Sequence, residues 1–160
     1  MKTFLSRMLL FFCFIPYIPP TCTVGFSSTF TVCKVGDTFQ LNVVVNNVAD
    51  LYGYQLTVVY DTERLRVVDM GLPLKHFLTP NEEANIFVVR LGVEDSGAVC
   101  AVTLLTVREP AKTGSGVLLT ISFEVVKSGF TWLRLEGVIL GTPEAEVIHC
   151  TTDNHLVVVR

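Results

Sequence analysis

The sequence carries little charge and no concentration of positive charge. Charged residues make up 17% of the 160 positions, and the formal net charge at pH 7 is -3. Proteins that bind nucleic acids need clustered Lys and Arg to neutralise phosphates, and no such cluster occurs here, so we exclude DNA and RNA as partners. Apolar residues make up 50% of the chain. That is enough for one sandwich-sized core, and we expect a single domain.

The motifs of metal and nucleophilic catalysis are also missing. The three histidines are scattered, and neither a His-Glu-x-x-His pair nor a Cys-x-x-Cys pair is present, so a zinc site lacks its usual ligand spacing. No Gly-x-Ser-x-Gly elbow and no Asp-x-Asp-x-Asp-Gly calcium loop occurs. The pairs Glu82-Glu83 and Glu94-Asp95 could act on a glycoside in principle, but adjacent carboxylates in a polar loop are usually just solvated. The sequence therefore predicts no enzyme, no metal site and no cofactor.

The amino terminus has the order of a secretory signal peptide. Lys2 and Arg7 precede a short apolar run, which is followed by prolines. Small residues up to Gly25 favour cleavage after that position, so we expect residues 1–25 to be a signal peptide and 26–160 the secreted or cell-surface domain. The apolar run is shorter than the roughly 20 residues that a membrane span needs, and only an uncleaved segment would tie the protein to a membrane.

The five cysteines divide at that expected cleavage site. Cys13 and Cys22 would leave with the signal peptide, and Cys33, Cys100 and Cys150 would stay. We expect at least one of the remaining three to be oxidised after export, and we prefer a Cys33–Cys150 pair because the first and last strands of a jelly roll lie close together. Sequence spacing does not fix the connectivity, and three buried thiols are the alternative.

The body of the chain reads as short strands. Segments with period-two alternation or β-branched runs are separated by Gly, Asp, Asn and Pro, and no stretch sustains a helical period. We expect turns at Asn46-Asn47, at Asp50 and at Gly114-Ser115-Gly116. The pattern predicts an all-β fold, a single nine-stranded jelly-roll β-sandwich. The predicted strands are 30–35, 39–45, 54–60, 65–69, 86–93, 99–107, 117–126, 131–140 and 156–160.

Several of these segments follow one another in a recognisable order. A Val-Gly-Asp turn at 35–37 leads into a strand, and the segment 51–61 contains a Gly-aromatic step and ends in Tyr60-Asp61, with Leu65 four residues beyond. The segments 93–97 and 115–125 continue the series. In order and spacing, the chain from Phe30 to Arg160 resembles a cohesin. It departs from many cohesins at Thr62, where Pro is common, and at Gly53 and Gln55, where Asn and Asp are common.

The resemblance implies a secreted, non-catalytic module that binds a dockerin-type domain on one sheet face. The calcium would be held by the dockerin, and the assembly would serve polysaccharide degradation. Alternation along this segment puts Tyr54, Leu56, Val58 and Tyr60 inward, and it puts Gln55, Thr57 and Val59 outward. In 86–93 we expect Phe87, Val89, Leu91 and Val93 in the core, which leaves Arg90 outward. The predicted partner-binding residues are Gln55, Thr57, Val59, Arg90, Glu94, Asp95 and Ser96.

Two other functions fit the sequence. A carbohydrate-binding module would recognise polysaccharide directly and needs exposed aromatic residues that stack on sugar rings. Trp132 is the single Trp, and it shares a strand face with Phe130 and Arg134, so Trp132 and Arg134 are the alternative sugar-binding residues. Burial in the core is the more usual explanation of such aromatic residues. A structural or adhesion protein of the cell surface fits the composition equally well.

Overall fold

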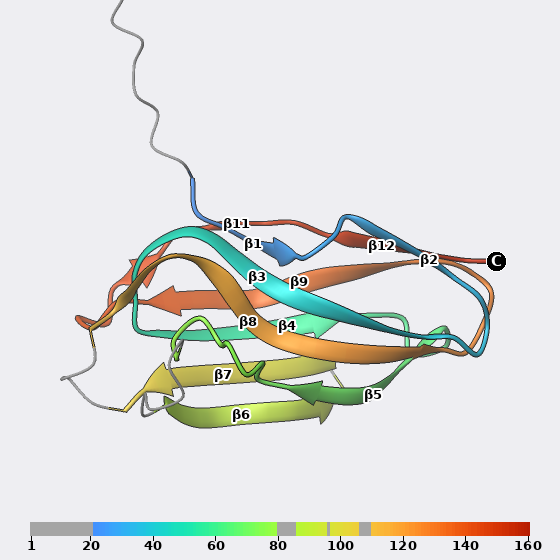
Figure 1. Ribbon diagram of the computed structural model, residues 1–160, viewed down its shortest axis with the longest axis horizontal. Helices are drawn as coiled ribbons and strands as arrows, with labels where there is room; N and C mark the ends of the chain where they lie inside the picture. The colour runs from blue at the N-terminus through green and yellow to red at the C-terminus, as the bar shows by residue number, and fades with distance from the viewer. Residues whose placement is uncertain (1–20, 80–85, 96, 106–109) are drawn as a thin grey trace, which may run out of the picture.

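Two β-sheets pack face to face in the computed structural model, which describes residues 21–79, 86–95, 97–105 and 110–160 (Figure 1). The five-stranded sheet has the order β11-β1-β3-β8-β5. Its strands are β1 (Thr23–Phe26), β3 (Thr38–Leu51), β5 (Leu65–Gly71), β8 (Lys112–Val125) and β11 (Thr151–Thr152). The part of the chain that the structure describes contains no helix.

The seven-stranded sheet forms the other layer. It has the order β2-β12-β9-β4-β7-β6, and β10 pairs with β9 outside that path. Its strands are β2 (Phe30–Cys33), β4 (Gly53–Val59), β6 (Ile86–Glu94), β7 (Gly97–Leu104), β9 (Gly129–Gly141), β10 (Val147–Ile148) and β12 (His155–Val159). The neighbours pair antiparallel except β2 with β12 and β1 with β11, which are parallel. The all-β sandwich predicted from the sequence is confirmed.

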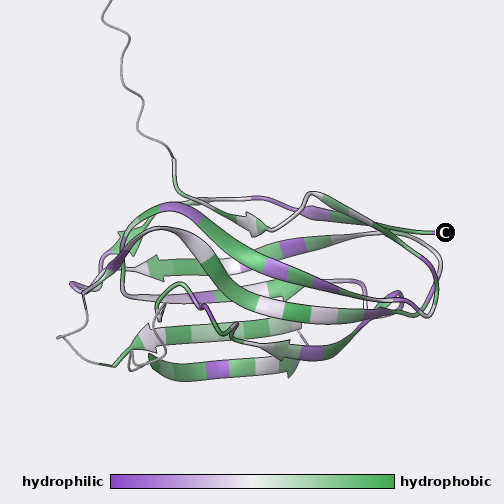
Figure 2. Ribbon diagram, in the orientation of Figure 1, coloured by the Kyte–Doolittle hydropathy of each residue, from purple (hydrophilic) through white to green (hydrophobic). Residues whose placement is uncertain are grey.

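The core lies between the sheets and follows from period-two alternation. In Figure 2, hydrophobic and hydrophilic colours alternate along the long strands β3 and β8. Side chains of one parity point inward and are buried, as Leu41, Val43 and Val45 are on β3. Phe123 of β8 is fully buried and contacts the rings of Phe39 and Tyr60. Burying a side chain of that size contributes about 1.5–3 kcal/mol to the free energy of folding.

All nine predicted strands are present, and the structure adds β1, β10 and β11. The expected turns at Asn46-Asn47, Asp50 and Gly114 are wrong, because β3 and β8 run through them and remain paired. Asn47 and Asp50 adopt the left-handed conformation that their residue types tolerate, with φ of 54° and 53°. Register shifts on either side of Val48 show that these residues form β-bulges, which bend the strand without ending it.

The predicted core set on β6 is wrong. Phe87, Leu91 and Val93 are 52%, 38% and 52% exposed, and Val89 is also exposed. One reason is a bulge between Val88 and Arg90, which breaks the period-two alternation. The other is position, because β6 is the edge strand of its sheet and the narrower opposite sheet does not cover it fully.

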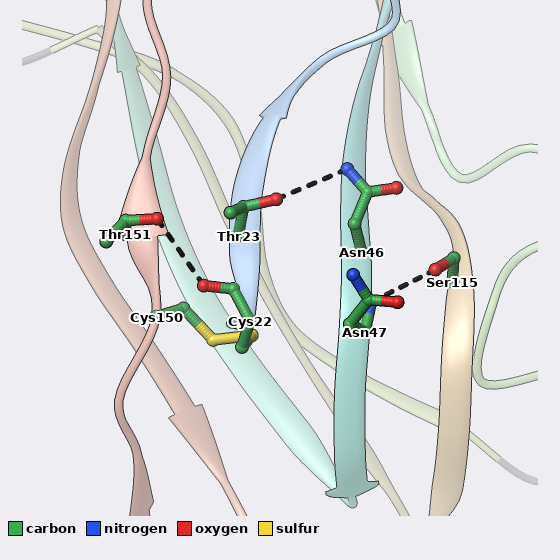
Figure 3. Close-up of a disulfide and its surroundings, with 7 residues drawn as sticks. All are labelled: Cys22, Thr23, Asn46, Asn47, Ser115, Cys150 and Thr151. Carbon is green, nitrogen blue, oxygen red and sulfur yellow. Dashed lines mark hydrogen bonds between the residues drawn. A yellow bond between two sulfur atoms is a disulfide. The ribbon is translucent and has the colours of Figure 1, made fainter. Parts of the chain in front are cut away.

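The cysteine pairing also differs from expectation. Cys150 is oxidised, but its partner is Cys22 (Figure 3). Cys33 and Cys100 are buried free thiols. Cys22 lies directly before β1, which pairs with β3 on one side and β11 on the other. Cleavage after Gly25 would remove Cys22 and most of β1. Residues 1–20 lie outside the described residues, so a signal peptide there stays a prediction.

Candidate binding face

The outer face of the seven-stranded sheet has β4 near its centre, between β9 and β7. Tyr54, Leu56 and Val58 of β4 are buried between the sheets. Gln55, Thr57 and Val59 point the other way and are exposed or partly exposed. Alternation along β4 therefore placed the three predicted outward residues correctly.

Cross-strand pairing shows which residues share this face. Gln55 is paired with Ile139 of β9 on one side and with Ala101 of β7 on the other, and Ala101 is paired with Arg90 of β6. Directly paired residues point to the same side of a sheet. One row of side chains therefore crosses four strands and brings Gln55 and Arg90, two of the predicted residues, onto one surface.

A second row runs beside the first. Thr57 is paired with Glu136 of β9 and with Val99 of β7. Val99 and Ala101 point outward but are almost completely buried. Ala101 lies between the longer side chains of Gln55 and Arg90. The middle of the face is thus apolar at its floor and semi-polar at its surface, which is the usual composition of a protein-binding surface.

The floor of the face is hollowed where small residues meet. A depression of ≈ 450 Å³ is lined by Gly53, Ala101, Gly141, Gln55 and Ile139, among others. A Cβ on Gly53 would lie 2.9 Å from the Thr103 hydroxyl oxygen and 3.2 Å from the Val102 carbonyl oxygen, so a side chain at position 53 would require β7 to shift. Gly53 therefore fits the close packing of β4 against β7.

The charged residues of the face lie at its rim. Arg90 donates to the Glu94 carboxylate through Nε and a terminal nitrogen, and both side chains are accessible to solvent. An exposed ion pair of this kind contributes less than about 1 kcal/mol to stability and leaves little net charge. Asp95 is exposed in the turn after β6, and Ser96 lies outside the described residues. The structure therefore joins Arg90 and Glu94 at one rim, with Asp95 adjacent in the chain.

The sequence pattern did not predict the residues that β7 and β9 contribute to this face. Glu136 and Ile139 are exposed on β9 beside Thr57 and Gln55. Alternation with buried Leu133 and Leu135 could have placed Glu136 outward, whereas Ile139 follows the irregularity at Gly137, whose φ is 58°. The uninterrupted apolar run of β7 does not show which of its residues face outward, since both faces of this strand are buried.

The alternative sugar-binding residues lie on the same sheet face, toward its β2 edge. Trp132 and Phe130 are 50% and 72% exposed, so the core explanation of these aromatic residues is wrong. Arg134 follows on the same face of β9, paired with Val59 of β4. A groove of ≈ 290 Å³ is lined by Trp132, Phe130 and Arg134 together with the end of β4 and Asp61.

Within the described residues, no group of three His, Cys, Asp or Glu side chains could hold a metal ion. A search of the same residues finds no helix with the length and apolar character of a membrane span.

Comparison with known proteins gives a family and a fold. A family model described as "Cohesin domain" matches residues 27–148. No curated protein sequence matches the chain. Among solved structures, a non-cellulosomal cohesin from the hyperthermophilic archaeon Archaeoglobus fulgidus superposes with a TM-score of 0.67 at 17% identity, covering 88% of this chain and 92% of that one.

Two further solved structures are similar to the same degree. The cohesin CaCohA2 from Clostridium acetobutylicum has a TM-score of 0.65 at 17% identity, with 87% of this chain and 90% of that chain covered. The type I cohesin–dockerin complex Coh-OlpA-Doc918 from Clostridium thermocellum contains a chain with a TM-score of 0.66 at 17% identity, and 88% of this chain and 100% of that chain are covered. At these identities the structural similarity establishes the fold.

Proposed function

This chain belongs to the cohesin domain family, and from that premise we propose that it is a secreted module that binds a dockerin-type domain. The family is one of non-catalytic binding modules, so the module works by association. The structurally similar cohesin from Clostridium thermocellum was solved in a cohesin–dockerin complex, which supports a partner of the same class here. The assembly it enters would serve polysaccharide degradation, and the calcium would be held by the dockerin.

The surface we propose for this partner is the outer face of β9, β4, β7 and β6. The observation that carries the proposal is the set of cross-strand rows that joins Gln55 and Thr57 to β6 and β9. Four strands span about 14 Å between the outermost pair, since neighbouring strands lie about 4.8 Å apart. A surface of this width suits a standard interface, in which each partner buries about 800 Å².

The residues of this face have different proposed roles. Gln55 and Thr57 form its centre, where contacts exclude water and truncation typically costs about 2 kcal/mol or more. Val59 contributes at the end of β4, beside Arg134 of β9. Arg90, Glu94 and Asp95 belong to the rim, where a charge affects the association rate more than the affinity. Ser96, which lies outside the described residues, stays a predicted partner-binding residue.

Thr57→Asp tests the face. An unpaired carboxylate at the centre would be desolvated on binding, so we expect Kd for a calcium-loaded dockerin to rise at least about 30-fold. Because the new carboxylate would lie opposite Glu136 on β9, we expect a loss of stability as well, of less than about 1 kcal/mol. Isothermal titration calorimetry measures the first quantity and a thermal melt the second.

Thr38→Asp is the matched control. It makes the same change at an exposed position of β3, on the opposite sheet, and should bind dockerin as the wild type does. If Thr57→Asp binds as tightly as the wild type, the proposed face is wrong.

A further inference from the structure

The edge of the seven-stranded sheet formed by β2, β12 and β9 carries an exposed aromatic surface. Trp132 of β9 is paired with Leu156 of β12, and Leu156 is paired with Phe30 of β2. A parallel row consists of Phe130, Val158 and Val32. Since paired residues share a face, six apolar side chains stand side by side on the outside of the sheet.

Three of these six residues are aromatic and strongly exposed. Phe30 is 63%, Phe130 72% and Trp132 50% accessible to solvent. An apolar patch on the surface of a soluble domain usually marks a binding site. We name the three residues and their aliphatic neighbours Leu156, Val158 and Val32 the aromatic face.

The spacing of the aromatic residues is set by the sheet. Phe30 and Trp132 lie two strands apart, or about 9.6 Å, and Phe130 and Trp132 lie two residues apart along one strand, or about 6.7 Å. The larger spacing is close to the length of two linked pyranose rings in an extended chain. The C–H groups on the flat side of a pyranose ring carry partial positive charge and pack against the negative face of an aromatic ring.

Polar groups border the aromatic face where β9 meets the end of β4. The groove of ≈ 290 Å³ there is lined by Trp132, Phe130, Arg134, Tyr60 and Asp61, among others. None of the four ion pairs found among the described residues includes Arg134. Its guanidinium is therefore available as a donor to a ligand hydroxyl.

Asp61 supplies a fixed acceptor on the other side of the groove. Its Oδ1 accepts from the Glu63 backbone N–H at 2.9 Å, and its Oδ2 is paired with Arg64 Nε at 3.0 Å. A carboxylate has about four acceptor positions, so two remain for a ligand. A groove that combines aromatic rings, a donor and an acceptor matches the chemistry of a sugar ring, which presents apolar faces and a hydroxyl rim.

The three aromatic side chains, about 200 Å² each and exposed as these are, offer roughly 350 Å² of apolar surface. A narrow, extended ligand can cover an area of this size.

We propose that the aromatic face and its groove bind an extended polysaccharide of pyranose rings, with Trp132, Phe130 and Phe30 stacking on the rings and Arg134 and Asp61 bonding the hydroxyls. The site adjoins the proposed dockerin-binding surface, because Val59 of β4 also lines the groove, but Trp132, Phe130 and Phe30 are not among the residues proposed to contact dockerin. The hexasaccharide titration and the dockerin calorimetry are separate measurements, so failure of one proposal is distinguishable from failure of the other.

Trp132 gives a direct readout because it is the only Trp in the chain. Titration of the mature protein with cellohexaose, xylohexaose and chitohexaose should give a saturable change in Trp fluorescence for at least one of them. Phe130→Ala keeps the fluorophore and should weaken that binding at least tenfold. Trp132→Ala should reduce the fraction of protein retained on the matching insoluble polysaccharide at least tenfold.

Phe87→Ala is the matched control, since it removes an aromatic residue that is 52% exposed on β6, at the other edge of the sheet. It should leave the titration and the retention unchanged. The proposal is overturned if none of the three hexasaccharides changes the fluorescence saturably. It is also overturned if Phe87→Ala reduces retention on the insoluble polysaccharide as much as Trp132→Ala does. A wild-type dimer in sedimentation velocity that Trp132→Ala dissociates would also overturn it, in favour of self-association.

Discussion

At the residue scale, His76 is the histidine whose protonation the fold controls most strongly. Its side chain is 1% exposed, and its Nε2 lies 2.8 Å from the Tyr54 hydroxyl oxygen. That hydroxyl donates its proton to the Leu118 carbonyl at 2.6 Å, so His76 Nε2 must be the donor to Tyr54. Nδ1 then carries a lone pair, and it has no hydrogen-bond partner among the described residues.

This arrangement makes the free energy of unfolding depend on pH. Burial lowers the pKa of His76 from 6.5 to about 4, because a charge on Nδ1 would lie unpaired in the core. The unfolded state therefore binds a proton at a higher pH than the folded state does. The contribution of neutral His76 is complete above pH 6.5 and is lost as the pH falls to about 4. The loss amounts to roughly 3 kcal/mol of unfolding free energy.

We predict that His76→Gln flattens this dependence. Glutamine can still donate to Tyr54 but does not titrate, so urea unfolding measured between pH 7 and 4 should show a smaller decline than in the wild type. His155 adds a decline of the same sign, because burial also lowers its pKa, so part of the slope should persist. His149→Gln, at an exposed position, is the control and should keep the wild-type slope. An unchanged slope in His76→Gln would contradict the assignment.

At the scale of the strand, β4 and β6 differ in what their side chains contribute. Leu56 of β4 is fully buried at the centre of the sheet, and Leu91 of β6 is 38% exposed at its edge. We predict that Leu56→Ala lowers the unfolding free energy by about 2–5 kcal/mol. Leu91→Ala should cost less than about 1 kcal/mol, because it removes little contact and leaves no closed cavity. If chemical denaturation gave equal losses of unfolding free energy for Leu56→Ala and Leu91→Ala, the side chain of Leu91 would be buried in solution and β6 would not be an exposed edge strand.

The strands differ in how far the sequence predicts them. Alternation identified β4 and the long strands because one face of each is buried along its whole length. β1, β10 and β11 have two to four residues, which is too short for a pattern to appear. In β3, Asn47 and Asp50 do take the turn-like conformation their types favour, but Val45, Val48 and Leu51 stay buried and paired with β8. Because these core residues stay packed and paired, the turn-like conformations at Asn47 and Asp50 form bulges within β3 and do not end the strand.

At the scale of the whole molecule, the seven-stranded sheet presents two candidate faces side by side. Alternation placed Thr57 and its neighbours outward, but the row that joins them to Arg90 depends on register, which the sequence does not fix. The outward parity of Trp132 was equally visible in the sequence. Its exposure was not, because that depends on the absence of a covering layer over β9 and β12. Val59 and Arg134 lie where the two faces meet.

The Cys22–Cys150 disulfide also acts at this scale, since it joins residues 128 positions apart. Beside the bridge, Thr151 donates its hydroxyl to the Cys22 carbonyl at 3.5 Å (Figure 3) and its backbone N–H to the same oxygen at 3.0 Å. β1 joins β11 to β3. Burial raises the pKa of the Cys33 and Cys100 thiols, the latter to about 11, so neither is a ready nucleophile for exchange with the bridge.

We therefore predict that the exported protein keeps Cys22, so that any signal cleavage falls before that residue. Mass spectrometry of the non-reduced mature protein should find a Cys22 peptide linked to a Cys150 peptide, and thiol labelling under denaturing conditions should count two free thiols. Cys22→Ser should lower the unfolding free energy by about 2–4 kcal/mol, because the unfolded chain loses its long-range constraint. Cys33→Ser serves as the control that leaves the bridge intact. A mature amino terminus at Phe26 with three free thiols would contradict this pairing.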